Sequence, residues 1–190
     1  MNARIVGACA FVACVGLGGI VEAQKGQPQG VTTQPNQTDS ALTKQTRDVF
    51  QTIENNVLKA AREMPEKTYT FKPADSTRTF GELVAHIASV QSTLCANING
   101  HAGKQAPSVQ SKEDDVKALE QSVAECEVSF GELSAQNMNK TVESPAGQLT
   151  HMAALLYIVT HASEEYGQLG VYLRVNHLAP PTNDSAKGAL

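Results

Sequence analysis

The sequence predicts an all-α protein, and more specifically a four-helix bundle. Four long segments carry apolar residues at spacings of three and four, which places those residues on one face of an α-helix. No strand-like alternation of apolar and polar residues competes with this pattern, and no internal repeat is evident. A chain of 190 residues is long enough to bury one ordinary core, and amphipathic helices bury their apolar faces against one another.

The first 23 residues have the pattern of an export signal. A short positive end at residues 1–4 precedes an uncharged, mostly apolar run at 5–21, and small residues then allow cleavage after Ala23. A retained membrane anchor and lipoprotein processing at Cys14 are the alternatives. The polar, Gln-rich sequence that follows favours cleavage, so we expect an exported protein, periplasmic or secreted, without stable membrane insertion.

The remaining chain divides by composition into three parts. Residues 24–38 are rich in Gln, Gly, Pro and Thr and are predicted to be a disordered linker. The helical bundle is predicted over residues 39–181, where a double proline ends it, and residues 182–190 form a short polar tail that we expect to be flexible.

Capping residues mark the first two helices. The first is predicted to begin near Asp39, a favourable cap, and to end before Pro65. The second is predicted to open with Thr79 and Glu82, whose spacing is that of a capping box, and to end at residues 99–100, Asn-Gly.

The third and fourth helices follow the same logic. Ser111 is a suitable cap for a third helix, whose apolar period continues for more than four turns. Ser144 and Pro145 are predicted to open the fourth helix, because proline is tolerated at the first helical position, and this helix is predicted to run to about Asn176.

Charge and cysteine content limit the classes of function. The net charge of −4 is spread along the chain, and no clustered basic patch suggests a nucleic-acid partner. Two cysteines, Cys95 and Cys126, remain after the predicted cleavage. In an oxidising compartment such a pair is expected to form a disulfide, and two small buried core residues are the alternative.

A candidate metal site lies on the predicted second and fourth helices. His161 and Glu165 are one turn apart inside an apolar stripe, and His86 lies near the core-facing side of the second helix. Two imidazoles and one carboxylate leave coordination positions open, which suits a catalytic or substrate-binding ion. The alternatives are histidines that are hydrogen-bonded in the core and a simple helical ion pair.

The other polar residues near this site carry less weight. Glu164 is a reserve ligand that we expect to face solvent, and Gln168 is a candidate hydrogen-bond donor to the ligands. His151 is about 60° from the metal face around the helix, so we assign it a surface or core role. His101 and His177 are expected to be solvated.

Two stretches resemble the DinB (damage-inducible protein B) family of metal-binding four-helix bundles. They are Y-T-F-K-P through F-G-E-L-V-A-H-I-A at residues 69–88, and H-A-S-E-E-Y-G-Q-L-G-V-Y-L-R through P-P at residues 161–181. The resemblance implies a DinB/YfiT-like metalloenzyme architecture with a divalent metal held by His86, by His161 and by a second histidine four residues later. Here that last position is Glu165, which can also ligate Zn²⁺, Ni²⁺, Mn²⁺ or Fe²⁺.

The resemblance also limits the functions to consider. The wider family includes metal-dependent transferases that activate a low-molecular-weight thiol such as bacillithiol or mycothiol, and its members often form homodimers. Because such thiols are cytosolic, metal-assisted hydrolysis of a small molecule fits an exported protein better than thiol transfer. A bundle that binds a metal or small ligand without turnover, and a bundle with a degenerate site, are the alternatives.

Overall fold

The computed structural model describes residues 37–103 and 111–182. The predicted signal, most of the predicted linker and nearly all of the predicted tail lie outside these residues. Within them, no helix is both long enough and apolar enough to cross a membrane.

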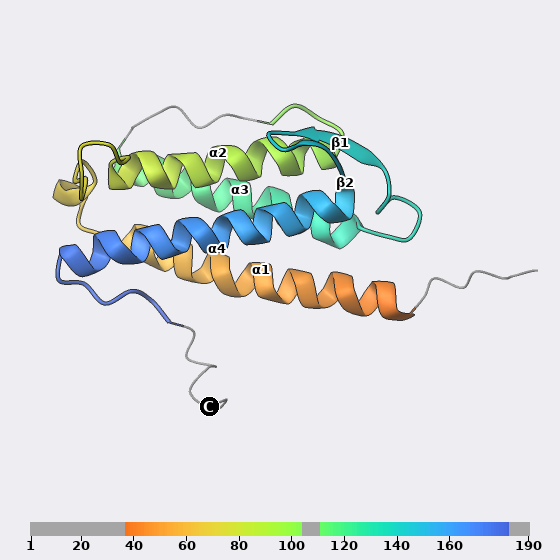
Figure 1. Cartoon of the computed structure of the whole chain (residues 1–190), viewed down its shortest axis with the longest axis horizontal. Helices are drawn as coiled ribbons and strands as arrows, with labels where there is room; N and C mark the ends of the chain where they lie inside the picture. Colours follow the sequence, from red (N-terminus) through yellow and green to blue (C-terminus); the bar gives the residue numbers. More distant parts are fainter. Residues whose placement is uncertain (1–36, 104–110, 183–190) are drawn as a thin grey trace, which may run out of the picture. The chain divides into compact units, whose positions relative to one another are not determined.

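The described residues form the predicted all-α bundle (Figure 1). Its helices are α1 (Gln37–Glu63), α2 (Phe80–Ile98), α3 (Lys112–Glu132) and α4 (His151–Val175), with a short 3-10 helix, η1 (Glu66–Thr68), between α1 and α2. Helix α2 packs mainly along α3, and α1 packs mainly along α4. Because α2 also contacts α4, side chains from these two helices can meet inside the bundle.

Local capping signals fix several of the helix ends. The Thr79 hydroxyl accepts the backbone N–H of Glu82, and the Glu82 carboxylate accepts that of Thr79, which confirms the predicted capping box. Ser111 caps α3 through its hydroxyl, which accepts the backbone N–H of Asp114 and donates to the Asp114 carboxylate. Helix α2 ends where predicted, since Gly100 has a φ of +83°, a conformation that few residues other than glycine adopt.

The predicted start of the fourth helix is wrong. Residues 141–150 form a β-hairpin instead, with β1 (Thr141–Ser144) antiparallel to β2 (Gly147–Thr150). Pro145 lies in the hairpin turn. Val142 and Leu149 are cross-strand partners that pack on the bundle, and this packing stabilises strands that are too short to show a period in the sequence. Helix α4 then begins at His151, with Thr150 as its cap.

The core consists of two apolar clusters with polar side chains between them. One cluster joins the end of α1, the start of α2 and the end of α4 with Leu119 of α3. The other joins Phe50 of α1, the end of α2 and the start of α4 with Cys126 and Phe130 of α3. Between them lie Glu54, Gln91 and Ser122, which are all buried. Gln91 donates to Glu54 Oε1 and accepts from Ser122 Oγ, at 2.5 and 2.8 Å.

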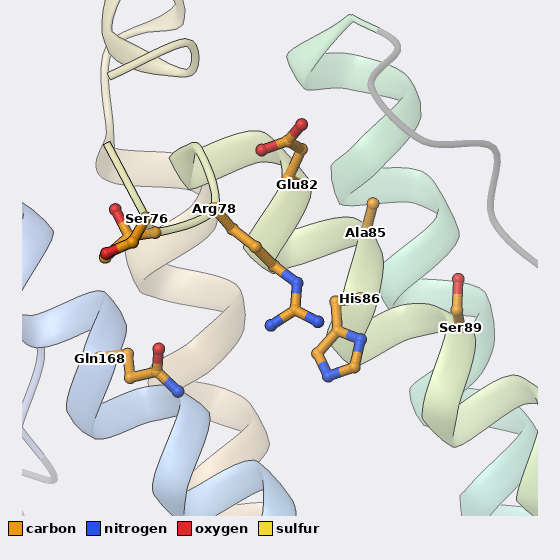
Figure 2. Close-up of a pocket in the computed structure, with 8 residues that line it drawn as sticks. Ser76, Arg78, Glu82, Ala85, His86, Ser89 and Gln168 are labelled. Carbon is orange, nitrogen blue, oxygen red and sulfur yellow. The ribbon is translucent and has the colours of Figure 1, made fainter. Parts of the chain in front are cut away.

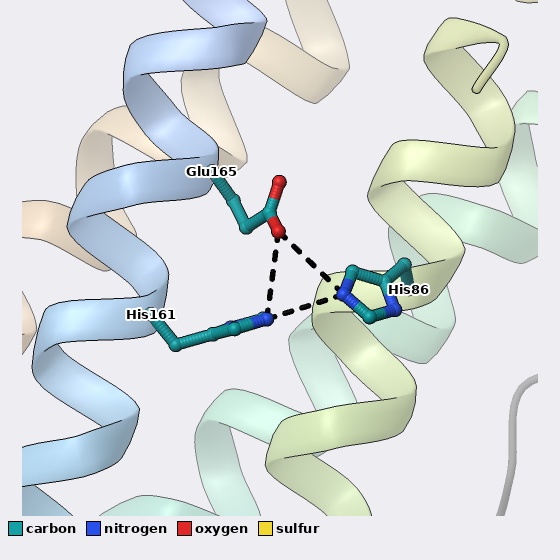
Figure 3. A group of neighbouring side chains, drawn as sticks. All are labelled: His86, His161 and Glu165. Atoms are coloured by element: carbon teal, nitrogen blue, oxygen red, sulfur yellow. Dashed lines mark hydrogen bonds and ion pairs between the residues drawn. The ribbon is translucent and has the colours of Figure 1, made fainter. Parts of the chain in front are cut away.

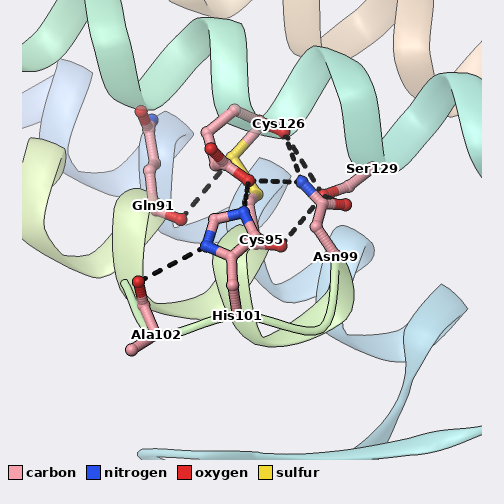
Figure 4. Close-up of polar contacts among 8 residues, drawn as sticks. Gln91, Cys95, Asn99, His101, Ala102, Cys126 and Ser129 are labelled. Atoms are coloured by element: carbon pink, nitrogen blue, oxygen red, sulfur yellow. Dashed lines mark hydrogen bonds and ion pairs between the residues drawn. A yellow bond between two sulfur atoms is a disulfide. The ribbon is translucent and has the colours of Figure 1, made fainter. Parts of the chain in front are cut away.

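The predicted disulfide joins Cys95 of α2 to Cys126 of α3 (Figure 4). The Cα atoms of the two residues are 5.0 Å apart, and both side chains are fully buried. Ser129 and Asn99 form a hydrogen bond of 2.8 Å beside the bridge, so covalent and polar links together join the two helices there.

Candidate metal centre

The three predicted ligands come from the facing sides of α2 and α4. His161 and Glu165 are one helical turn apart on α4, so their side chains project in the same direction. His86 lies on α2, directly opposite them. His86 and His161 are partly exposed, whereas Glu165 is buried, and the cluster therefore lies at the edge of the core with access to solvent.

One nitrogen or oxygen atom from each residue converges on a common point (Figure 3). The Nε2 atoms of His86 and His161 are 3.2 Å apart. Glu165 Oε1 lies 3.5 Å from each of them. These three distances define a nearly equilateral triangle of electron-rich atoms.

This triangle has the size that a small divalent cation requires. In the plane of a triangle with sides of 3.2, 3.5 and 3.5 Å, the point equidistant from the corners lies about 2.0 Å from each of them. Bonds from Zn²⁺ to imidazole nitrogen and carboxylate oxygen have lengths of about 2.0–2.2 Å. The contacts to the carboxylate are also longer than an ordinary N–H···O hydrogen bond of about 2.9 Å. Donor types and spacing thus both fit a metal ion.

Neighbouring side chains hold two of the three candidate ligands in place. Gln168 donates a hydrogen bond of 2.7 Å to Glu165 Oε2, which leaves Oε1 directed at the imidazoles. Tyr157 stacks on the His161 ring, with ring centroids 6.1 Å apart and an angle of 20° between the planes. His161 Nδ1 is buried and makes no hydrogen bond to the described residues, so the stack takes the place of the acceptor that commonly orients a ligating histidine.

Burial also keeps the imidazoles in the form that binds a metal. It lowers the pKa of His86 and of His161, and in both cases the positive charge of Arg78 lowers it further. The pKa of Glu165 is raised by burial, an effect that Arg78 opposes. Neutral imidazoles offer the lone pairs that a cation needs, and the bound cation would in turn favour the ionised carboxylate.

The other candidate side chains, Glu164, His151, His101 and His177, lie outside this cluster. Glu164 is exposed, as predicted. His151 is buried at the start of α4, ten residues and about 15 Å along the helix from His161, and so has a core role. His101 is exposed and lies 2.9 Å from a Glu125 oxygen, and His177 is exposed beyond the end of α4.

Arg78 is the residue at this site that sequence reasoning did not identify. It lies in the loop before α2 and lines a polar cavity of about 710 Å³ with His86 and Gln168 (Figure 2). The Tyr172 hydroxyl donates a hydrogen bond of 2.6 Å to the Arg78 carbonyl, which ties this loop to α4. The only signal in the sequence is a cation directly before a capping box, which is a common arrangement at an exposed helix start.

Comparisons with known proteins give the family and the fold. The DinB superfamily matches over residues 50–169. A DinB-like protein from Bacillus cereus is similar in structure, with a TM-score of 0.59 and 13% identity over 73% of this chain and 95% of that chain. A DinB-like protein from Bacillus subtilis has a TM-score of 0.58 and 23% identity over 72% of this chain and 95% of that chain. A mutant of the mycothiol-dependent maleylpyruvate isomerase has a TM-score of 0.54 and 16% identity over 70% of this chain and 66% of that chain. No curated protein matches the sequence.

Proposed function

Because the chain belongs to the DinB superfamily, we propose that His86, His161 and Glu165 bind one divalent ion, Zn²⁺, Ni²⁺, Mn²⁺ or Fe²⁺, and that the protein is a metal-dependent enzyme acting on a small molecule. The observation that carries this proposal is the triangle of three donor atoms whose centre lies about 2.0 Å from each. Three protein ligands leave positions for water and substrate, as in catalytic rather than structural sites.

Hydrolysis is the reaction class that the surroundings favour. A bound divalent ion supplies a Lewis acid and an acidified water molecule. The disulfide between Cys95 and Cys126 removes the two cysteines of the described residues as nucleophiles. Gln168 fixes the carboxylate of Glu165, and the polar cavity beside His86 offers room for a small substrate.

Thiol transfer is the second candidate. It is supported by the structural similarity to a mycothiol-dependent maleylpyruvate isomerase. Export would separate the protein from cytosolic thiols, so we rank this reaction below hydrolysis.

Elemental analysis of protein purified without chelators tests the metal proposal. We expect stoichiometric metal in the natural protein and none in His86→Ala or His161→Ala. His101→Ala is the matched control, because His101 is exposed and lies outside the cluster. Absence of metal from the natural protein, or equal metal content in all variants, would refute the ligand assignment.

A turnover assay separates an enzyme from a binding module. Metal-loaded protein is offered esters, amides and thiol–electrophile pairs, with His86→Ala as the control. Turnover that is lost in the variant supports an enzyme, and its reaction type distinguishes hydrolysis from transfer. Metal binding without turnover of any of these substrates supports a non-catalytic bundle, and absence of both supports a degenerate site.

We also propose that the mature protein is exported, to the periplasm or beyond the cell. The buried disulfide between α2 and α3 supports this, since such bonds persist in oxidising compartments. Mass spectrometry of the exported fraction should find a chain that begins near Gln24, and an intact Met1 there would contradict the cleavage. Self-association stays a prediction, which light scattering of the mature chain tests.

A further inference from the structure

One face of α2 lines two cavities that adjoin at the proposed metal site. The polar cavity of about 710 Å³ lies towards the start of the helix, and a second cavity of about 510 Å³ lies between its later turns and the β-hairpin. His86 and Ser89 line both cavities. Residues at spacings of three and four on a helix share one face, so the two cavities follow one another along that face.

An exposed arginine lines the polar cavity. Arg78 is exposed, and it forms no ion pair with any residue of the described ranges. Figure 2 shows its guanidinium extending from the loop into the space between His86 on α2 and Gln168 on α4. A planar guanidinium presented in this way matches the oxygens of a carboxylate or phosphate, which it can bind through two parallel hydrogen bonds.

The two carboxylates nearest this arginine are engaged in other contacts. Glu82 also lines the cavity, but its carboxylate accepts the backbone N–H of Thr79 at 2.6 Å and points away from the guanidinium in Figure 2. The Glu165 carboxylate is held by Gln168 and faces the imidazoles. The positive charge of Arg78 therefore remains available to an anion from solvent.

The second cavity is more apolar. Val90 and Leu94 of α2 line it together with Pro145 of the hairpin turn. Glu143 also borders it, and its carboxylate accepts a hydrogen bond of 2.8 Å from Gln148 on the neighbouring strand. An apolar group that enters this cavity would leave water and contact aliphatic side chains.

We propose that the substrate is a small amphiphilic anion whose carboxylate or phosphate binds Arg78 and whose apolar chain lies against Val90, Leu94 and Pro145. The part of the molecule that connects the head group to the apolar chain then lies beside His86, which lines both cavities. This inference rests on the proposed function in one respect: the bound anion is a substrate only if the metal site is catalytic. Binding of the anion requires Arg78 whether or not the metal is present.

Calorimetric titration with octanoate tests the anion site. Removing a charge-assisted hydrogen bond should raise the dissociation constant of octanoate about tenfold in Arg78→Gln. Arg174→Gln is the matched control, an exposed arginine of α4 that lines neither cavity, and should leave this constant unchanged. Octyl phosphate in place of octanoate shows which head group is preferred. Equal octanoate affinity in Arg78→Gln and the natural protein, or no binding of either probe, would overturn the inference.

Chain length tests the apolar half. Octanoate should bind more tightly than butanoate by up to about fourfold per methylene group. Val90→Asp should abolish that difference, and its persistence would place the chain elsewhere and overturn this half of the inference.

Titrations with and without EDTA separate this inference from the metal proposal. Arg78-dependent binding to protein without metal supports the anion site even if elemental analysis finds no ion. Binding that disappears with EDTA but is unaffected by Arg78→Gln would put the carboxylate on the metal and overturn the role of Arg78, while the metal proposal would stand.

Discussion

The free energy of unfolding of the natural protein should fall as the pH rises, because Glu54 is buried. Replacing Glu54 by glutamine should remove most of this fall. Glu54 lies on α1 between the two apolar clusters and is 1% exposed. Its Oε1 accepts a hydrogen bond from Gln91, whereas its Oε2 has no hydrogen-bond partner within the described residues. Burial raises the pKa of Glu54 from 4.5 to about 8, although the Gln91 hydrogen bond lowers it in part.

The sign of the effect follows from this raised pKa. Below pH 4.5 the carboxyl group is protonated in both the folded and the unfolded chain and does not affect the pH dependence. Between pH 4.5 and about 8 the unfolded chain is ionised while the folded chain keeps its proton, so the free energy of unfolding falls as the pH rises. Each pH unit is worth about 1.4 kcal/mol, so the loss between pH 5 and pH 7 is about 3 kcal/mol.

Glutamine has the shape of the protonated carboxyl group and cannot ionise. Glu54→Gln should therefore gain about 3 kcal/mol over the natural protein between pH 5 and pH 7, and this difference should level off above pH 8. Urea unfolding of both proteins at each pH, with the disulfide intact, measures it. Glu63→Gln, an exposed position on the same helix, is the control and should show no such trend. A difference between Glu54→Gln and the natural protein that does not change with pH would refute the reasoning.

Three further perturbations test other parts of the structure. The double variant Cys95→Ala/Cys126→Ala should lose about 3–4 kcal/mol of unfolding free energy in urea, because the bridge closes a loop with a sequence separation of 31; unchanged stability would contradict this. Thr79→Ala should lower the free energy of unfolding by about 1 kcal/mol in the same assay, because the capping box is lost. Thr79→Ser should keep the capping box and the stability of the natural protein. Glu165→His should retain stoichiometric metal in elemental analysis and Glu165→Ala should not; equal metal in both would exclude Glu165 as a ligand.

Signals that act within a few residues of the chain made much of the fold predictable. The capping box at Thr79 and the cap at Ser111 satisfy backbone groups in their own helices, so their residue types alone indicate helix starts. The hairpin at 141–150 was missed because its two strands of four residues each depend on packing against the bundle. Pro145 is as compatible with a turn as with a first helical turn, and only tertiary contacts distinguish the two.

The convergence of His86, His161 and Glu165 was predictable for a similar reason. The spacing of His161 and Glu165 places them on one face of a helix, independently of how that helix packs. His86 joins them as soon as its own helix lies opposite. Glu54 was not predictable, because a glutamate beside an apolar stripe is ordinarily exposed, and its burial depends on Gln91 and Ser122 from two other helices.

Because position 165 is a glutamate and not a third histidine, the positive charge of Arg78 contributes more to the attraction of an anion. With two imidazoles and one carboxylate, a bound divalent ion would have a net charge of +1 at the site, in place of the +2 that three imidazoles would leave. This lower charge would attract an anionic substrate less strongly. Arg78 adds a positive charge on the same side of α2, in a cavity lined by His86, and so restores attraction for an anion without raising the charge on the ion itself. If Glu165→His weakens the dependence of octanoate binding on Arg78, the two charges act on the same ligand; independent effects would mean that they do not.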